Sequence, residues 1–389
     1  MKILVICQYY APEPFRIADI CEALVKEGNE VDVVTSFPNY PMGEIYEGYK
    51  NGSHKDEVIN GVNVHRVFTI GRKSGALYRF INYYTYSIFS TLYAAGLKKE
   101  YDVVFVYQLS PVLMAKAALK YKKKFGKRVV LYCLDLWPES LTLGGIKKGG
   151  LIYSYYKRLS KRIYAAADKI AVSSRMFEGY LKEMLSVSPK RVQYLPQYAE
   201  DVFCASHKSA EGALSVTFAG NIGTTQSIET ILYAAKKLSG KSVQFNFYGD
   251  GSGFNKMVEL ARSLQLENVT FHGRVSVEAL PEKYAESDAL IVTLSDNAVL
   301  SMSFPGKIQS YMAAGKPIVA ALNGEAARII TEAQCGFVSP AEDVDGLVTC
   351  IESLMSANRA VLGENSRTYY EKNFLKEDFI NKLTELLAE

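Results

Sequence analysis

The sequence lacks the marks of several protein classes. Its 389 residues contain no uninterrupted apolar run of the ~20 residues that span a bilayer. The apolar run Ile3 to Cys7 is too short for a signal peptide, and the charged residue Glu13 soon follows it. Six cysteines are scattered, mostly within apolar runs, without close pairs or a zinc-binding spacing. These absences predict a cytoplasmic protein that stays on one side of any membrane and whose thiols are reduced and buried.

Motifs for a metal or a nicotinamide cofactor are also missing. The four histidines are dispersed, and Asp343-Val344-Asp345 stands in a polar turn before a predicted helix, where Asp is a common cap. No Gly-x-Gly-x-x-Gly motif follows the first predicted strand. The net charge of +4 is mild, and no nucleic-acid-binding module is present. We therefore expect no metal, no cofactor and no nucleic-acid partner.

Short apolar strands alternate with helical stretches in two series, and the length suits two domains. Strands of the first series are expected at 2–8, 30–35, 62–67, 102–107, 128–134 and 168–172, and those of the second at 214–220, 243–249, 269–273, 289–294, 317–320 and 336–338. This rhythm predicts α/β domains whose parallel sheets are covered on both faces. Residues 196–213 are polar and lose periodicity, which indicates a linker.

The segment 301–320 has the pattern of a turn, a helix and a buried strand. Lys307 falls in the first turn of the expected helix, and Pro305 suits the helix start because its missing N–H is not needed there. Free backbone N–H groups are expected at Ser303, Phe304, Gly306 and Lys307, where they would converge with the positive end of the helix dipole. The segment therefore predicts a phosphate-binding site.

Three further motifs follow expected strands: Gly220-Asn221-Ile222-Gly223 with Gln226, then Gly249-Asp250-Gly251, then His272-Gly273-Arg274. Together with 301–320, in this order, they resemble glycosyltransferase family 4. The resemblance covers nearly the whole chain and implies a GT-B fold, with two facing Rossmann-like domains, an interdomain cleft and a retaining reaction. It implies an acceptor-binding domain over 1–200, a nucleotide-sugar-binding domain over 201–370, and a last helix over 371–389 that packs back toward the first domain.

The resemblance also implies roles for these residues. Two loops would hold the nucleotide sugar, with the base near Arg274. The first carries Gly220, Asn221, Gly223 and Gln226, and the second carries Gly249, Asp250 and Gly251. Alternatively, the Gly249 loop is only a tight turn and Arg274 only a surface cation. If Arg274 does belong to the site, Lys307 and Arg274 would balance the negative charge of the departing diphosphate.

Two departures from the family pattern concern charge. Most members hold the diphosphate with a basic pair where this chain has the uncharged Asn221 and Gln226. The usual pair of glutamates is replaced by Met302 and Ser310, so Ser310 or Gln309 would grip the ribose, and Met302 suits a 6-deoxy or N-acetylated donor sugar. The motifs Gly-Asn-Ile-Gly and Pro-Gly-Lys-Ile-Gln-Ser-Tyr also resemble those of a bacterial subgroup, which includes presumed N-acetyl-L-fucosamine transferases of surface polysaccharide clusters.

Three residues of the first half are candidates for the site. Asp135 follows an expected strand, and we expect it to contact the sugar or the incoming hydroxyl, or else to cap the next helix. Glu139 is the second catalytic candidate. Arg16 either pairs with a phosphate or an acceptor carboxylate, or forms a salt bridge with Asp19 or Glu13.

Cations and aromatic residues mix in two segments, 72–99 and 147–162. Such segments lie at a lipid interface with aromatic side chains down, or are plain core. The interface reading predicts a peripheral protein on the anionic inner face of the cytoplasmic membrane.

Together these features predict a glycosyltransferase of O-antigen, capsule or exopolysaccharide synthesis. It would move a sugar from a UDP-sugar to a polyprenyl-diphosphate-linked saccharide acceptor. Two alternatives stay open: a UDP-sugar 2-epimerase of the same fold, and a non-catalytic nucleotide-sugar-binding scaffold subunit.

Overall fold

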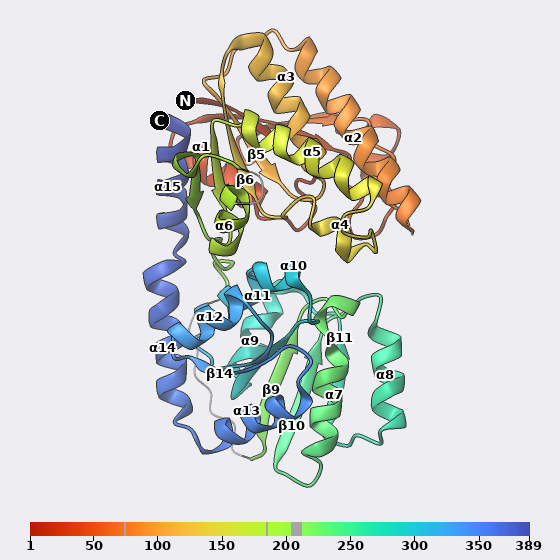
Figure 1. Ribbon diagram of the computed structural model, residues 1–389, viewed down its shortest axis with the longest axis vertical. Helices are drawn as coiled ribbons and strands as arrows, with labels where there is room; N and C mark the ends of the chain where they lie inside the picture. Colours follow the sequence, from red (N-terminus) through yellow and green to blue (C-terminus); the bar gives the residue numbers. More distant parts are fainter. Residues whose placement is uncertain (74, 184–185, 204–211) are drawn as a thin grey trace. The chain divides into compact units, whose positions relative to one another are not determined.

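The protein is described by a computed structural model that covers residues 1–73, 75–183, 186–203 and 212–389 (Figure 1). The chain divides into two compact units. Unit 1 comprises Met1–Leu195 together with Ile380–Glu389, and unit 2 comprises Pro196–Phe379.

Unit 1 contains a sheet in the order β3-β4-β2-β1-β5-β6-β7-β8. All neighbouring strands are parallel except β3 and β4. The chain proceeds outward from β1 through β2 and then returns to β5 on the other side of β1, so the sheet has a topological switch point between β1 and β5. The strands are β1 (Lys2–Ile6), β2 (Glu30–Ser36), β3 (Asp56–Ile59), β4 (Val62–Val67), β5 (Val103–Gln108), β6 (Arg128–Cys133), β7 (Lys169–Val172) and β8 (Val192–Tyr194).

Helices cover this sheet, and α2, α3 and α5 pack beside one another (Figure 1). The last helix of the chain also joins this unit, because Thr384 donates a hydrogen bond to Glu27 and Arg128 donates one to the carbonyl of Leu387, each 2.9 Å long. The helices are α1 (Ile17–Lys26), α2 (Ala76–Gly96), α3 (Lys116–Phe125), α4 (Ser140–Leu143), α5 (Leu151–Ala166), α6 (Arg175–Glu183) and α15 (Lys376–Ala388), with 3-10 turns η1 (Glu47–Gly52), η2 (Val112–Ala115) and η3 (Pro189–Arg191).

Unit 2 contains a fully parallel sheet in the order β11-β10-β9-β12-β13-β14, with its switch point between β9 and β12. Successive residues of its strands point into two different cores, as Val319 and Ala320 of β13 do. Both faces are therefore buried, which explains the nearly continuous apolar strand sequences. The strands are β9 (Leu214–Ala219), β10 (Val243–Tyr248), β11 (Val269–Gly273), β12 (Ala289–Thr293), β13 (Ile318–Ala321) and β14 (Gly336–Ser339).

The helices of unit 2 divide between these two cores. Apolar residues of α7, α8 and α13 line one, and those of α9, α11, α12 and α14 line the other. Their bounds are α7 (Ile228–Lys237), α8 (Phe254–Ser263), α9 (Leu280–Ala285), α10 (Ala298–Met302), α11 (Gly306–Ala313), α12 (Glu325–Glu332), α13 (Val344–Ser356) and α14 (Arg359–Asn373), with 3-10 turns η4 (Thr224–Gln226) and η5 (Val277–Ala279).

The two expected βα series and their parallel sheets are confirmed. Two short strands were missed, because the edge strand β3 alternates polar and apolar residues over only four positions and β8 has only three residues. Five cysteines are free and buried, as expected, whereas Cys204 lies outside the described residues. No helix in the described part of the chain is long and apolar enough to cross a membrane.

Candidate functional site

The loops after β9 and β10 meet at the carboxyl edge of the sheet in unit 2. Gly220 and Gly249 both have positive φ, +137° and +147°. A Cβ atom added to Gly249 would lie 1.9 Å from the carbonyl oxygen of Gly220, and one added to Gly251 would lie 2.6 Å from that of Ile222. Gly249 and Gly251 are therefore required because the two loop backbones touch at these positions, not merely because each loop turns.

Helix α11 is held against this edge by Tyr311. The Tyr311 hydroxyl, fully buried, accepts a hydrogen bond of 3.1 Å from the backbone N–H of Ala219, the last residue of β9. The start of α11 consequently lies beside the Gly220 loop and near the switch point, where open parallel sheets bind their ligands.

Lys307 in the first turn of α11 is itself partly exposed, but the Nζ atom at the end of its side chain is buried. Its Nζ atom finds no hydrogen-bond partner in the described part of the chain and lies 4.0 Å from the centre of the Phe218 ring. A Cβ atom on Gly220 would approach this Nζ to 3.1 Å. Burial lowers the pKa of Lys307 from 10.5 to about 7. Because buried polar groups are almost always satisfied, an unpaired amine at a helix start indicates an anionic ligand.

The remaining residues at the start of α11 depart in part from expectation. The N–H of Ser303 is not free, since it donates to the Leu300 carbonyl at 3.0 Å as α10 ends, and the Ser303 hydroxyl donates to Val299. The prediction of a free N–H at Ser303 was therefore wrong. Pro305 occupies the cap position, and α11 begins at Gly306 with no side-chain cap. The Phe304 ring packs against the Phe374 ring, with the two ring centres 5.4 Å apart.

A carboxylate that the sequence analysis missed lies beside Ser310. The Ser310 hydroxyl donates to Glu200 Oε2 at 3.2 Å, and the buried Gln309 side chain donates to the carbonyl of Gln197. Gln309 is therefore committed to the chain itself. Glu200 went unnoticed because it stands in the aperiodic linker, far from α11 in the sequence.

The other predicted residues of unit 2 line the same edge. The Asn221 amide donates to Gln226 Oε1 at 3.5 Å, and Asp250 accepts the N–H of Gly251 at 2.7 Å. Arg274 is exposed, directly after β11. His272 stacks on Tyr248 with ring centres 4.3 Å apart. The structure therefore groups the loops after β9, β10 and β11 with the start of α11 in one unit.

Asp135, Glu139 and Arg16 belong to unit 1. Asp135 Oδ2 accepts the N–H of Ser110 at 2.8 Å, and burial raises its pKa. Asp135 does not cap the next helix, because α4 begins at Ser140 after an N-terminal cap at Glu139. Arg16 is the residue that precedes α1.

Glu139 is 2% exposed and its carboxylate is occupied. It accepts hydrogen bonds from Tyr153 at 2.7 Å and Tyr180 at 2.8 Å, and it pairs with Lys148. Although burial acts to raise the pKa of Glu139, these partners lower it below its ordinary value. The carboxylate thus ties α4 to α5 and α6.

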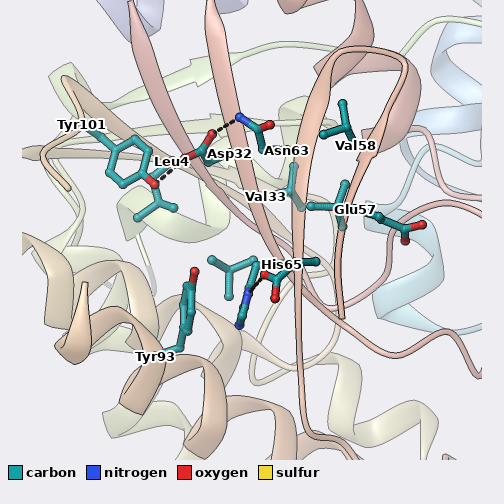
Figure 2. Close-up of a pocket in the computed structure, with 12 residues that line it drawn as sticks. Leu4, Asp32, Val33, Glu57, Val58, Asn63, His65, Tyr93 and Tyr101 are labelled. Carbon is teal, nitrogen blue, oxygen red and sulfur yellow. Dashed lines mark hydrogen bonds and ion pairs between the residues drawn. The ribbon is translucent and has the colours of Figure 1, made fainter. Parts of the chain in front are cut away.

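A pocket of about 320 Å³ lies elsewhere in unit 1, among β2, β3, β4 and α2 (Figure 2). Asp32 in this pocket accepts hydrogen bonds from Tyr101 at 2.6 Å and Asn63 at 2.7 Å, and it pairs with Lys99. His65 bonds Asp56 and stacks on Tyr93. These polar side chains of the pocket thus form hydrogen bonds and ion pairs with one another.

Metal-binding geometry is not found among the described residues. Asp343 accepts the N–H of Gly346 at 2.9 Å and caps α13, as the sequence analysis expected, while Asp345 pairs with Lys237.

Comparison with known families follows the division of the chain. Residues 16–197 match Glycosyltransferase Family 4, and residues 201–373 match Glycosyl transferases group 1. The "Probable glycosyltransferase WbjE" of Pseudomonas aeruginosa is 28% identical over 295 residues, which cover 72% of this chain and 73% of that protein. The "Putative colanic acid biosynthesis glycosyl transferase WcaI" of Escherichia coli K12 is 23% identical and covers 98% of both chains.

Solved structures share the fold over the whole length. Sucrose-phosphate synthase from Thermosynechococcus elongatus superposes with a TM-score of 0.77 at 17% identity, covering 99% of this chain and 98% of its own. Anabaena Alr3699/HepE, solved in complex with UDP and glucose, superposes with a TM-score of 0.71 at 15% identity over 100% of both chains. The family matches favour a transferase over the epimerase and scaffold alternatives. The chain is a GT-B glycosyltransferase, with a family 4 domain followed by a group 1 domain, and it has relatives in bacterial polysaccharide biosynthesis.

Proposed function

We propose that this glycosyltransferase takes its sugar from a UDP-sugar whose diphosphate is held at the start of α11. The observation that carries the proposal is the buried, unpartnered Nζ of Lys307 beside Gly220. The protein Alr3699/HepE, which has the same fold, was solved with UDP and glucose, and this supports the class of donor.

The chemistry rests on charge stabilisation. A diphosphate that binds at the start of α11 raises the proton affinity of Lys307, so the amine becomes an ammonium where the negative charge of the leaving group develops. The N-terminus of α11 adds its dipole, and Arg274 adds an exposed cation. In a retaining reaction the acceptor hydroxyl attacks from the face that the diphosphate leaves, and Asp135 is our candidate for contacting that hydroxyl.

The ribose is assigned to Ser310 together with Glu200. The carboxylate of Glu200, which accepts from Ser310, stands close to the position where the family pattern has a glutamate. Met302 favours a donor sugar with a less polar edge, such as an N-acetylated or 6-deoxy sugar, and N-acetyl-L-fucosamine satisfies both descriptions. The loops at Asn221, Gln226, Gly249 and Asp250 are assigned to the nucleotide and the sugar.

The acceptor is proposed to be a polyprenyl-diphosphate-linked saccharide of O-antigen, capsule or exopolysaccharide synthesis, reached from the cytoplasmic membrane surface. Two helices of unit 1 support a peripheral location. Helix α2 exposes Leu77 (70%) and Leu92 (61%), and α5 exposes Leu151 (92%) near its basic residues. Apolar side chains flanked by cations suit an interface with anionic lipid.

The aromatic residues, however, do not all face outward. Tyr83 and Tyr86 are buried, so the expectation of an aromatic lipid-facing side on α2 was wrong for these two. The exposed side of α2 carries both aliphatic and aromatic side chains, among them Leu92, Tyr78 and Phe89. Tyr86 instead packs inward, where its hydroxyl donates to the Cys7 carbonyl at 2.8 Å.

A nucleotide-sugar binding screen tests the donor proposal. Thermal unfolding is measured with UDP, GDP and TDP sugars, and a UDP-sugar is expected to raise the melting temperature most, because a ligand of the folded state stabilises it. Lys307→Ala should remove that shift and slow transfer by roughly 10²-fold. A shift with Lys307→Ala equal to that of the wild type would refute the assignment.

Sedimentation with liposomes of anionic phospholipid tests the membrane proposal. The triple substitution of Arg158, Lys161 and Arg162 by Glu should release the protein from the pellet. As a matched control, three exposed cations of unit 2, Lys236, Arg262 and Lys372, are changed to Glu. Equal loss of sedimentation in both variants would show that net charge, and not this helix, drives binding.

A further inference from the structure

Arg72 in unit 1 occupies an unusual environment for a cation. Its guanidinium carbon lies 5.6 Å from the ring centre of Tyr40 and 5.9 Å from that of Tyr83, and its charge interacts electrostatically with Tyr9. The Tyr9 hydroxyl, on a side chain that is 3% exposed, is buried and has no hydrogen-bond partner among the described residues. No carboxylate of the described chain forms an ion pair with Arg72.

Arg66 in the same unit shows what a structural arginine looks like. Its side chain is fully buried, and its donors are taken by Glu57 at 2.6 Å and by the carbonyls of Ser36 and Ala11 at 3.2 and 2.6 Å. Among the residues that the structure describes, Arg72 has no comparable set of acceptors, although its guanidinium has five N–H donors. Arg72 therefore has hydrogen-bonding capacity that the described part of the chain leaves unused.

Nearby carboxyl groups are engaged elsewhere. Glu13 accepts the backbone N–H groups of Asn39 at 2.8 Å and Tyr40 at 2.7 Å, and burial raises its pKa to about 7. Asp135 accepts the N–H of Ser110. Neither carboxyl group pairs with Arg72, so no carboxylate among the described residues prevents its guanidinium from binding an anion from outside the chain.

The backbone around Arg72 is fixed in place. Its N–H donates to Asn39 Oδ1 at 3.2 Å, and the next residue, Lys73, donates to the Gly43 carbonyl at 2.7 Å. Asn82 of α2 donates to the Ile70 carbonyl at 2.7 Å. A guanidinium on such a support is pre-organised, which reduces the entropy lost on binding.

The position of Arg72 relates it to the reaction. It follows β4, while Tyr9 follows β1, Tyr40 follows β2 and Asp135 follows β6. These strands lie within one parallel stretch of the sheet, so all four residues stand at its carboxyl edge. Arg72 also lowers the pKa of Asp135 electrostatically, although burial outweighs this effect.

The surroundings favour a phosphoryl group attached to a hydrocarbon. Lys73 Nζ lies 5.4 Å from the centre of the Tyr78 ring, and Arg79 acts electrostatically on Tyr83, as Arg72 does. Three cations, Arg72, Lys73 and Arg79, therefore gather around the start of α2. The first turn of α2 has no acidic residue. Leu77 and Tyr78, which are 70% and 41% exposed, follow directly. Several cations match a multiply charged phosphoryl group, and the adjacent apolar side chains match a prenyl chain.

We propose that Arg72, with Tyr9, Tyr40 and Tyr83, binds the diphosphate of a prenyl-diphosphate-linked acceptor. The inference rests on the proposed function and adds the subsite that recognises the anionic part of the acceptor. It also corrects the assignment of Arg72 to a lipid-facing segment, because the side chain packs among tyrosines at the sheet edge.

Titration of farnesyl diphosphate into the full-length protein, saturated with UDP, tests the proposal. Saturation keeps the probe out of the donor site, and the fluorescence of Trp137, the single tryptophan, reports from unit 1, where its Nε1 bonds Ser110 at 2.9 Å. Arg72→Gln should weaken binding about 10- to 100-fold, and Arg72→Lys less, because a charged hydrogen-bonding partner is lost or reduced. Lys123→Gln, on an exposed cation of α3, is the matched control and should bind normally.

The outcomes separate this inference from the proposed function. If UDP stabilises the protein but Arg72→Gln binds farnesyl diphosphate like the wild type, only the Arg72 subsite is overturned; if UDP fails to bind, the donor proposal fails instead. Inorganic pyrophosphate that binds as tightly as farnesyl diphosphate would overturn the prenyl-linked class, as would equally tight, Arg72-dependent binding of glucuronate. Unchanged Trp137 emission and circular dichroism of the free Arg72→Lys variant confirm that its fold is intact.

Discussion

Replacement of Lys307 by methionine should stabilise the protein and abolish donor binding together. Methionine has a similar length, carries no charge and packs well against an aromatic ring such as Phe218. The substitution removes an amine that has no hydrogen-bond partner among the described residues. A residue kept for ligand binding is expected to reduce the stability of the free protein, and Lys307 fits that description.

The magnitude follows from the proton equilibrium of Lys307. Its pKa is about 7 in the folded protein, against 10.5 for an ordinary lysine. Unfolding at pH 7.5 therefore charges the amine, and the difference destabilises the folded state by about 4 kcal/mol. Because the folded pKa is the lower one, the destabilisation is full below pH 7 and fades as pH rises toward 10.5. We expect Lys307→Met to raise the free energy of unfolding by about 2 to 4 kcal/mol at pH 7.5.

Urea unfolding followed by two signals measures this effect. Trp137 fluorescence reports unit 1, so a transition seen by circular dichroism alone belongs to unit 2. The wild-type transition of unit 2 should gain about 2 to 3 kcal/mol between pH 7.5 and pH 9.5, whereas Lys307→Met should not. UDP should stabilise only the wild type. Lys236→Met serves as the exposed-lysine control. A destabilised Lys307→Met protein that still binds UDP would refute the reasoning.

Three further substitutions probe the ribose contact, the glycine loops of unit 2 and the Asp32 pocket of unit 1. Glu200→Gln should weaken UDP binding about tenfold by calorimetry but leave 2′,3′-dideoxy-UDP unaffected, and equal losses for both ligands would remove Glu200 from the ribose site. Gly249→Ala should destabilise unit 2 by about 3 kcal/mol or more and suppress UDP binding, because its Cβ would strike Gly220; a normal melting curve would contradict the contact. Asp32→Asn should cost about 2 kcal/mol at pH 7 in urea unfolding followed by Trp137, since hydrogen bonds keep the pKa of Asp32 low despite burial. That difference should shrink as pH falls below about 4, where the wild-type carboxylate also takes up a proton, and a difference independent of pH would count against it.

The fold was predictable because its signals are periodic and local. The buried strands of both units are short apolar runs, and β4 and β11 have the expected bounds, Val62–Val67 and Val269–Gly273. The glycine loops after β9 and β10 and the lysine in the first turn of α11 can also be identified from the sequence. The structure adds that the Nζ atom of Lys307 is buried and has no partner among the described residues, which a pattern of residue types does not reveal.

The remaining features depend on contacts between distant segments. Glu200 comes to Ser310 from a polar linker, and no local pattern connects the two. Arg72 belongs to a basic and aromatic segment in the sequence, yet the loops after β1 and β2 enclose it with Tyr9 and Tyr40. Ser303 loses its free N–H because the chain forms the short helix α10 directly before it. Each of these outcomes is decided by tertiary packing, which overrides local preference.

A crystal structure of the protein with UDP would show directly where the diphosphate binds. We predict that the diphosphate lies at the start of α11, with a phosphate oxygen within hydrogen-bonding distance of Lys307 Nζ and next to Gly220. A complex in which the phosphates bind elsewhere, with the Nζ of Lys307 still buried and without a partner, would rule out Lys307 as the ligand of the diphosphate.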